Sequence, residues 1–124
     1  MNDLPPSLPM AIIERAFRSP NGEVGILLGD AEAFLDACER DDIELLGWEL
    51  WIVDHAWSAD ARTPVPSAGV WCGLIPTRGD SLPAVIGGSG NLAVTRAELR
   101  AFDINALVDP AWVALTRVNF TLDV

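Results

Sequence analysis

The sequence of 124 residues contains no lysine and no tyrosine, and it has one histidine and two cysteines. Without lysine, the chain has neither a Schiff-base nucleophile nor a lysine general base. Cys38 and Cys72 are too few for the disulfide framework of a small secreted protein, and each lies in apolar sequence, as buried free thiols commonly do. The absence of lysine beside abundant alanine is typical of a GC-rich bacterial genome.

Targeting and membrane segments are also lacking. The first twelve residues, MNDLPPSLPMAI, have no basic region followed by a long apolar one, so they do not resemble a secretory signal. The longest apolar run, around residues 45–53, is interrupted by Glu49 and falls short of the roughly 18 residues that a membrane helix needs. A cytoplasmic location is therefore expected.

Positive charge is scarce, with eight arginines against 18 acids and a net charge of −10. Nucleic acids and anionic membranes are bound through clustered lysine and arginine, so neither is an expected partner. Residues 30–60 contain ten acids and a single base, Arg40, so nearly all of the net charge lies in this quarter of the chain. A cationic protein partner fits this distribution.

Half of the residues are hydrophobic, which suits a single globular domain over residues 1–124, with residues 1–9 as an extended lead-in. Ser7 is expected to cap a short helix through Arg18, although a strand fits the same residues. A strand is expected over residues 23–28. Asp30 is expected to cap a helix over residues 31–41, with a core-facing stripe formed by Ala31, Phe34, Leu35 and Cys38.

The strongest strand pattern covers residues 43–54. One predicted face holds Leu46, Trp48, Leu50 and Ile52, and the other holds Glu49, Trp51 and Val53. Gly47 indicates a bulge or a close approach of two backbones. Because both faces are largely apolar, this strand is expected to be central in its sheet.

The C-terminal half predicts short strands over residues 68–75 and 84–86, a flexible loop over residues 87–91 and a last strand in which Val118, Phe120 and Leu122 alternate with polar residues. The sequence from Thr95 to Glu98 has the pattern of a capping box that opens a helix to about residue 107. The predicted fold is α+β, a mostly antiparallel sheet of about five strands with two or three helices on one side.

The candidate binding surface combines the acidic segment with an aromatic side chain. An interface with a cationic partner would gain association rate from the charges and residence time from the aromatic anchor. A solvated helix face that keeps the protein soluble explains the same acids equally simply. The candidate partner-binding residues are Asp36, Glu39, Asp41, Asp42, Glu44, Glu49 and Trp51.

Two further classes stay open. A small enzyme or ligand-binding domain would place its pocket near His55, Cys72 and the loop from Gly87 to Gly90, although these residues form no nucleophile, phosphate-loop or metal-ligand motif. No catalytic residue, cofactor or metal is therefore expected. A structural subunit would bury both faces of the strand containing Trp48 and Trp51 by self-association. The oligomeric state does not follow from the sequence.

The helix AEAFLDACERDD followed by the strand IELLGWELWIVD resembles small bacterial immunity proteins of polymorphic toxin systems. In that family a short amphipathic helix leads into a Leu-Gly strand with aromatic and acidic residues. The resemblance covers about residues 30–55. It implies a cytoplasmic protein that binds and blocks one cognate toxin and has no catalysis of its own.

Overall fold

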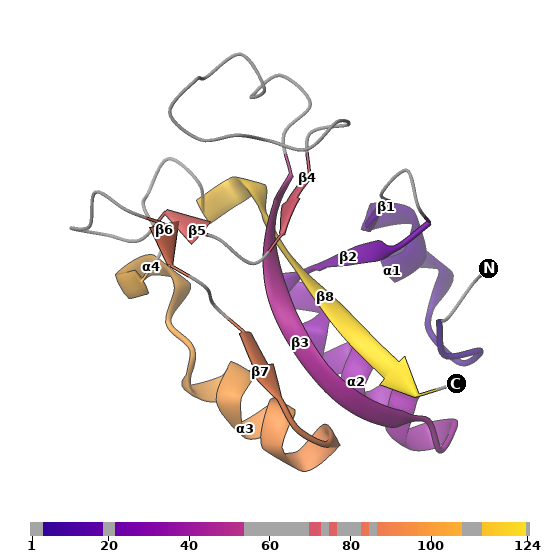
Figure 1. The fold of residues 1–124 in the computed structure, drawn as a ribbon. Helices are drawn as coiled ribbons and strands as arrows, with labels where there is room; N and C mark the ends of the chain where they lie inside the picture. Colours follow the sequence, from indigo (N-terminus) through magenta and orange to yellow (C-terminus); the bar gives the residue numbers. More distant parts are fainter. Residues whose placement is uncertain are drawn as a thin grey trace.

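The computed structural model describes residues 4–18, 22–53, 70–72, 75–76, 83–84, 87–107 and 113–123. Its elements are, in chain order, α1 (Met10–Arg15), β1 (Phe17–Arg18), β2 (Val24–Leu27), the 3-10 helix η1 (Leu28–Asp30), α2 (Ala31–Arg40), β3 (Glu44–Val53), β4 (Val70–Cys72), β5 (Ile75–Pro76), β6 (Pro83–Ala84), β7 (Gly87–Ser89), α3 (Leu92–Ala101), α4 (Ile104–Leu107), the 3-10 helix η3 (Val113–Leu115) and β8 (Thr116–Asp123). Figure 1 shows α2 behind the sheet and α3 beside β7.

The main sheet is antiparallel throughout, with the order β1-β2-β8-β3-β4. Its longest pairing joins β3 to β8, from Glu44 opposite Asp123 to Ile52 opposite Thr116. Because β8 occupies one side of β3 along this length, β4 and β7 share the other side. The predicted α+β fold, a five-stranded antiparallel sheet with two main helices, is confirmed, as is the central position of the strand with Trp48.

The core lies between the sheet and α1 and α2. The predicted stripe of α2 is buried, and Phe34 stacks on Phe120 of β8 with ring centroids 4.6 Å apart. Val118 and Phe120 are buried as the predicted alternation requires. Trp48 points toward α3, where its ring meets the edge of Phe102 at 6.2 Å. Apolar burial of this kind supplies most of the free energy of folding.

A bulge near the start of β3 changes the face of the sheet to which its side chains point. The register of β3 against β8 shifts between Leu45 and Gly47, so Leu45 is buried while Leu46 is 46% exposed. The prediction that Leu46 shares a face with Trp48 and Leu50 is therefore wrong, because an extra residue in a bulge reverses the side to which the preceding side chains point. The sequence predicts a bulge or a close approach of two backbones at Gly47, and the register shift lies directly before this residue.

The glycine-rich segment predicted as a loop instead forms β7, which pairs with Gly47, Trp48 and Glu49 of β3. A Cβ at Gly47 would lie 2.7 Å from the backbone oxygen of Gly88, and a Cβ at Gly87 would lie 2.6 Å from the backbone oxygen of Trp48. The glycines therefore permit a close backbone approach, which the composition alone does not distinguish from a mobile loop.

The predicted capping box is wrong, because the N-cap of α3 is Asn91, four residues before Thr95. The side chain of Asn91 accepts a hydrogen bond from the N–H of Val94 and caps the helix. Thr95 is fully buried inside α3, and its hydroxyl donates to the carbonyl of Gly90. The helix ends at Ala101, and α4 is a separate short helix, so the predicted single helix to about residue 107 is divided.

Of the two predicted N-caps in this part of the chain, Ser7 is wrong, whereas Asp30 is confirmed in its position but forms no cap hydrogen bond. Pro9, rather than Ser7, occupies the N-cap position of α1, which ends at Arg15, and Phe17 belongs to β1. Asp30 does stand at the N-cap of α2, but its carboxylate accepts two hydrogen bonds from Arg15 at 2.9 and 3.1 Å and makes no cap bond. A charged donor thus replaces the backbone donors as its partner.

Candidate partner-binding surface

The predicted acidic residues form two groups in the structure. The acids of the first group lie on α2 and form ion pairs with arginines of the same chain. Arg96 of α3 reaches α2, donating to Asp36 at 2.9 Å, to Glu39 at 3.2 Å and to Glu32. Arg100 donates to the other oxygen of Glu32 at 2.6 Å, and hydrogen bonds from Arg100 and Arg96 hold the pKa of Glu32 below its usual value. Asp36 and Glu39 therefore join two helices, a role that the sequence analysis did not predict.

Asp41 is also engaged inside the molecule. Its carboxylate accepts a hydrogen bond from the N–H of Ser7 at 2.7 Å, while Arg40 donates to the Ser7 carbonyl at 3.2 Å and to its hydroxyl at 3.3 Å. These bonds tie the segment before α1 to the C-terminal end of α2. Only part of this carboxylate is exposed to a partner.

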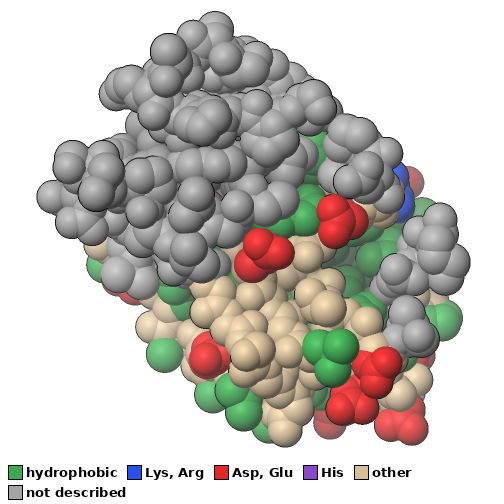
Figure 2. Space-filling view, viewed as in Figure 1, with side chains coloured by type: hydrophobic (Ala, Val, Ile, Leu, Met, Phe, Trp, Pro, Cys, Tyr) green, Lys and Arg blue, Asp and Glu red, His purple; other side chains and the backbone are tan. Residues whose placement is uncertain are grey.

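The second group lies at one end of the sheet. Glu44 stands opposite Asp123 in the β3–β8 ladder, and Asp42 precedes β3 with a positive φ of 55°. All three side chains are exposed, and none forms an ion pair with any residue in the described part of the chain. We call Asp42, Glu44 and Asp123 the acidic end. In Figure 2, acidic side chains gather at the lower right, where β8 ends in Figure 1.

Glu49 lies on the outer face of the sheet, the face opposite α2, where it stands across from Asn119. Burial raises the pKa of Glu49, and the charge of Glu23 raises it further. Two carboxylates therefore approach each other on this face, which Figure 2 shows with red side chains and only one blue patch at its margin. A cation close to Glu49 would lower the pKa of this carboxylate.

Trp51 does not occupy the exposed position predicted for it. The side chain is 1% exposed, packs against Phe17 and lies so close to Gly25 that a Cβ there would come within 3.0 Å of the indole. An anchor that inserts into a partner's pocket must be accessible, so this part of the prediction is wrong. Because Trp48 and Trp51 are both buried within one chain, their burial requires no second copy.

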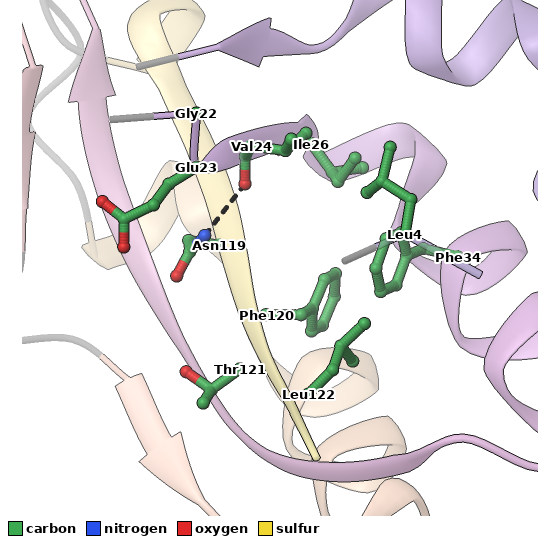
Figure 3. Close-up of a pocket in the computed structure, with 10 residues that line it drawn as sticks. All are labelled: Leu4, Gly22, Glu23, Val24, Ile26, Phe34, Asn119, Phe120, Thr121 and Leu122. Atoms are coloured by element: carbon green, nitrogen blue, oxygen red, sulfur yellow. Dashed lines mark hydrogen bonds between the residues drawn. The ribbon is translucent and has the colours of Figure 1, made fainter. Parts of the chain in front are cut away.

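A groove runs beside the C-terminal half of β8, and the sequence analysis did not identify it. The β2–β8 ladder contains only Ile26 opposite Val118 and Leu27 opposite Arg117, after which the amide of Asn119 donates to the Val24 carbonyl at 3.0 Å. The resulting cavity measures about 250 Å³. Figure 3 shows its apolar side chains on one side of β8 and its polar ones on the other. The apolar lining comprises Leu4, Val24, Ile26, Phe34, Phe120 and Leu122.

The structure describes only part of the pocket predicted for a small enzyme or ligand-binding domain. His55 and the side chain of Cys72 lie outside the described residues, and Gly87 to Ser89 form a strand. Cys38 is fully buried, and burial raises the pKa of its thiol to about 11, which leaves it unreactive at neutral pH. Across the described ranges, no cluster of three or more histidine, cysteine or acidic residues could hold a metal ion.

The chain matches no protein-family profile, no curated protein and no solved structure. Within the described ranges, no helix has the length and apolar character needed to cross a membrane. The resemblance to immunity proteins therefore stays a prediction.

Proposed function

We propose that this chain is a non-catalytic, immunity-type inhibitor that neutralises a cognate basic toxin, and that it binds this partner through the acidic end. The observation that carries the proposal is the contrast between the two acidic groups. Arg96 and Arg100 neutralise the acids on α2, whereas Asp42, Glu44 and Asp123 have no ion-pair partner among the described residues.

Like charges directly opposite each other across a ladder destabilise a sheet. Glu44 and Asp123 stand directly opposite each other in the β3–β8 ladder, and neither forms an ion pair with another described residue. We therefore expect repulsion between their like charges. A cationic partner would remove this repulsion on binding. Clustered exposed charge also steers an oppositely charged protein toward the surface and raises its association rate.

Glu49 extends the proposed surface along the outer face of the sheet. Its raised pKa shows that the carboxylate is held in an unfavourable environment, which a partner's arginine or lysine would improve. Asp36, Glu39 and Asp41 contribute to the negative potential around the site, but they are held by contacts within the chain. Trp51 supports the sheet from within and has no direct role in the proposed interface.

The test begins with capture of proteins from the source cells by the tagged chain at low salt, followed by elution at high salt. A captured basic protein is then expressed alone and together with this chain. The proposal expects growth arrest in the first case and rescue in the second. Asp42→Asn with Glu44→Gln should weaken rescue, whereas Glu14→Gln, which removes an exposed acid on α1, should leave it unchanged.

Asparagine is chosen at position 42 because it tolerates a positive φ better than most residues. Loss of rescue in this folded double variant would support the proposed surface. Equal rescue by the double variant and the unaltered chain would contradict it. Capture of a protein that is harmless when expressed alone would contradict the inhibitor function itself.

A further inference from the structure

We infer that the partner adds a β-strand to the sheet at the β8 edge, which is the side of residues 119–123 that faces away from β3. The added strand would be an extended segment in which apolar and basic residues alternate. This inference rests on the proposed function, because it gives the binding mode of the same partner. The β8 edge shares Asp123 with the acidic end but does not include Asp42 or Glu44, so substitutions of those two residues and measurements on the edge test the two proposals separately.

The backbone of β8 is paired on one side only over most of its C-terminal half. Against β3 the ladder continues to Asp123, whereas against β2 it ends at Val118. Beyond Val118, no strand in the described part of the chain pairs with this edge. The side-chain amide of Asn119 occupies the next ladder position by bonding to Val24. An open edge offers backbone N–H and C=O groups to another strand, here from about two or three residues.

The groove beside this edge fits the side chains of a strand. Its volume of about 250 Å³ falls below the roughly 300–1,000 Å³ typical of pockets that enclose a small-molecule ligand. In Figure 3, Phe120, Leu122 and Phe34 lie on the helix side of β8, while Asn119 and Thr121 lie on the outer side. Successive side chains of an added strand would fall alternately on these two sides. Every second residue of the added strand would therefore be apolar.

The carboxylates near the β8 edge favour basic residues at the outward positions of the added strand. Asp123 ends the edge, and Glu49 lies on the outer face across from Asn119. Basic residues at the outward positions of an added strand would meet these carboxylates. A second copy of this chain is disfavoured as the occupant, because its own β8 edge would bring the same carboxylates, rather than basic residues, to this edge. A basic segment of a different protein is the complementary occupant.

The probe is a nine-residue peptide of alternating arginine and valine, compared with the same peptide N-methylated at every amide. We expect the first peptide to slow amide hydrogen exchange at residues 119–123 of the full chain, as followed by NMR. Loss of two or three backbone hydrogen bonds should weaken binding of the methylated peptide by about ten- to a hundredfold. Asp123→Asn should weaken binding of the unmethylated peptide several-fold, and Glu14→Gln should not.

Three results would overturn the inference. The first is no binding of the alternating peptide. The second is peptide binding that leaves amide exchange at residues 119–123 unchanged and is equally strong after N-methylation. That result would contradict the added strand but not the proposed function of the acidic end. The third is protection of the same amides in the protein alone that increases with its concentration, which would make a second copy the occupant. Protection by the peptide in a chain that fails to rescue growth would instead contradict only the proposed function.

Discussion

At the scale of single residues, carboxylates serve two purposes in this protein. Those of α2 join two helices, and those of the acidic end are proposed to bind a partner. The side chain of Arg96 is only 16% exposed and forms ion pairs with three carboxylates of α2. The acidic end, by contrast, has no such arginine among the described residues. The ion pairs of Arg96 span 57 to 64 residues of sequence. Spacing along the chain therefore could not reveal which acids are neutralised.

Replacement of Arg96 tests the structural role of the first acidic group. Arg96→Met keeps the aliphatic stem but leaves Glu32, Asp36 and Glu39 close together without their shared cation. We expect a decrease of about 1–2 kcal/mol in the free energy of unfolding, measured by urea titration at low salt. Arg100→Met is the matched control, since Arg100 is 65% exposed and Glu32 is its only ion-pair partner among the described residues, and its effect should be smaller. Equal effects of the two variants would contradict the assignment.

Glu49 gives a prediction about pH. Its pKa is raised in the folded state, so the ionised carboxylate disfavours folding above that pKa, and stability is regained as the pH falls and the group binds its proton. Glu49→Gln should therefore raise the free energy of unfolding at pH 7 by about 1 kcal/mol or less. The difference should vanish below pH 4.5, the ordinary pKa of the group. A variant less stable than the parent at pH 7 would contradict this account.

At the scale of elements, the long periodic segments were predictable and the junctions were not. Helix α2 and strands β2, β3 and β8 follow from their apolar spacing, although the bulge before Gly47 interrupts the alternation of β3. The segment from Gly87 to Ser89 has no side-chain pattern, so its pairing with β3 depends on a backbone approach that only the folded structure reveals. The groove beside β8 arises where β2 stops pairing, which is also a property of register rather than of sequence.

The junction of β3 and β7 can be tested through its glycines. Gly47→Ala would bring a methyl group to 2.7 Å from the backbone oxygen of Gly88, so the strands must separate or shift. We expect a loss of about 1–3 kcal/mol in the free energy of unfolding. Gly29→Ala is the matched control, because a Cβ at Gly29 meets nothing within 4 Å. Similar unfolding curves for the two variants would show that β7 does not approach β3 this closely.

At the scale of the whole molecule, folding changes the meaning of the acidic segment. In the sequence it is one block of ten acids, and the predicted interface consists of six of these acids together with Trp51. In the structure, Arg96 donates hydrogen bonds to Asp36 and Glu39, and the N–H of Ser7 donates one to Asp41. Trp51 is buried. Asp42, Glu44 and Glu49 are the predicted residues left for a partner. The fold adds Asp123 and the β8 edge beside them.

The most direct measurement of the central claim is the association rate of the captured basic partner across a range of salt concentrations. We predict that the rate for the unaltered chain falls steeply as salt increases, because screening weakens the attraction between separated charges. Asp42→Asn with Glu44→Gln should lower the rate at low salt by about tenfold and flatten its salt dependence, while Glu14→Gln should match the unaltered chain. Identical rates for all three proteins at low salt would contradict an interface at the acidic end.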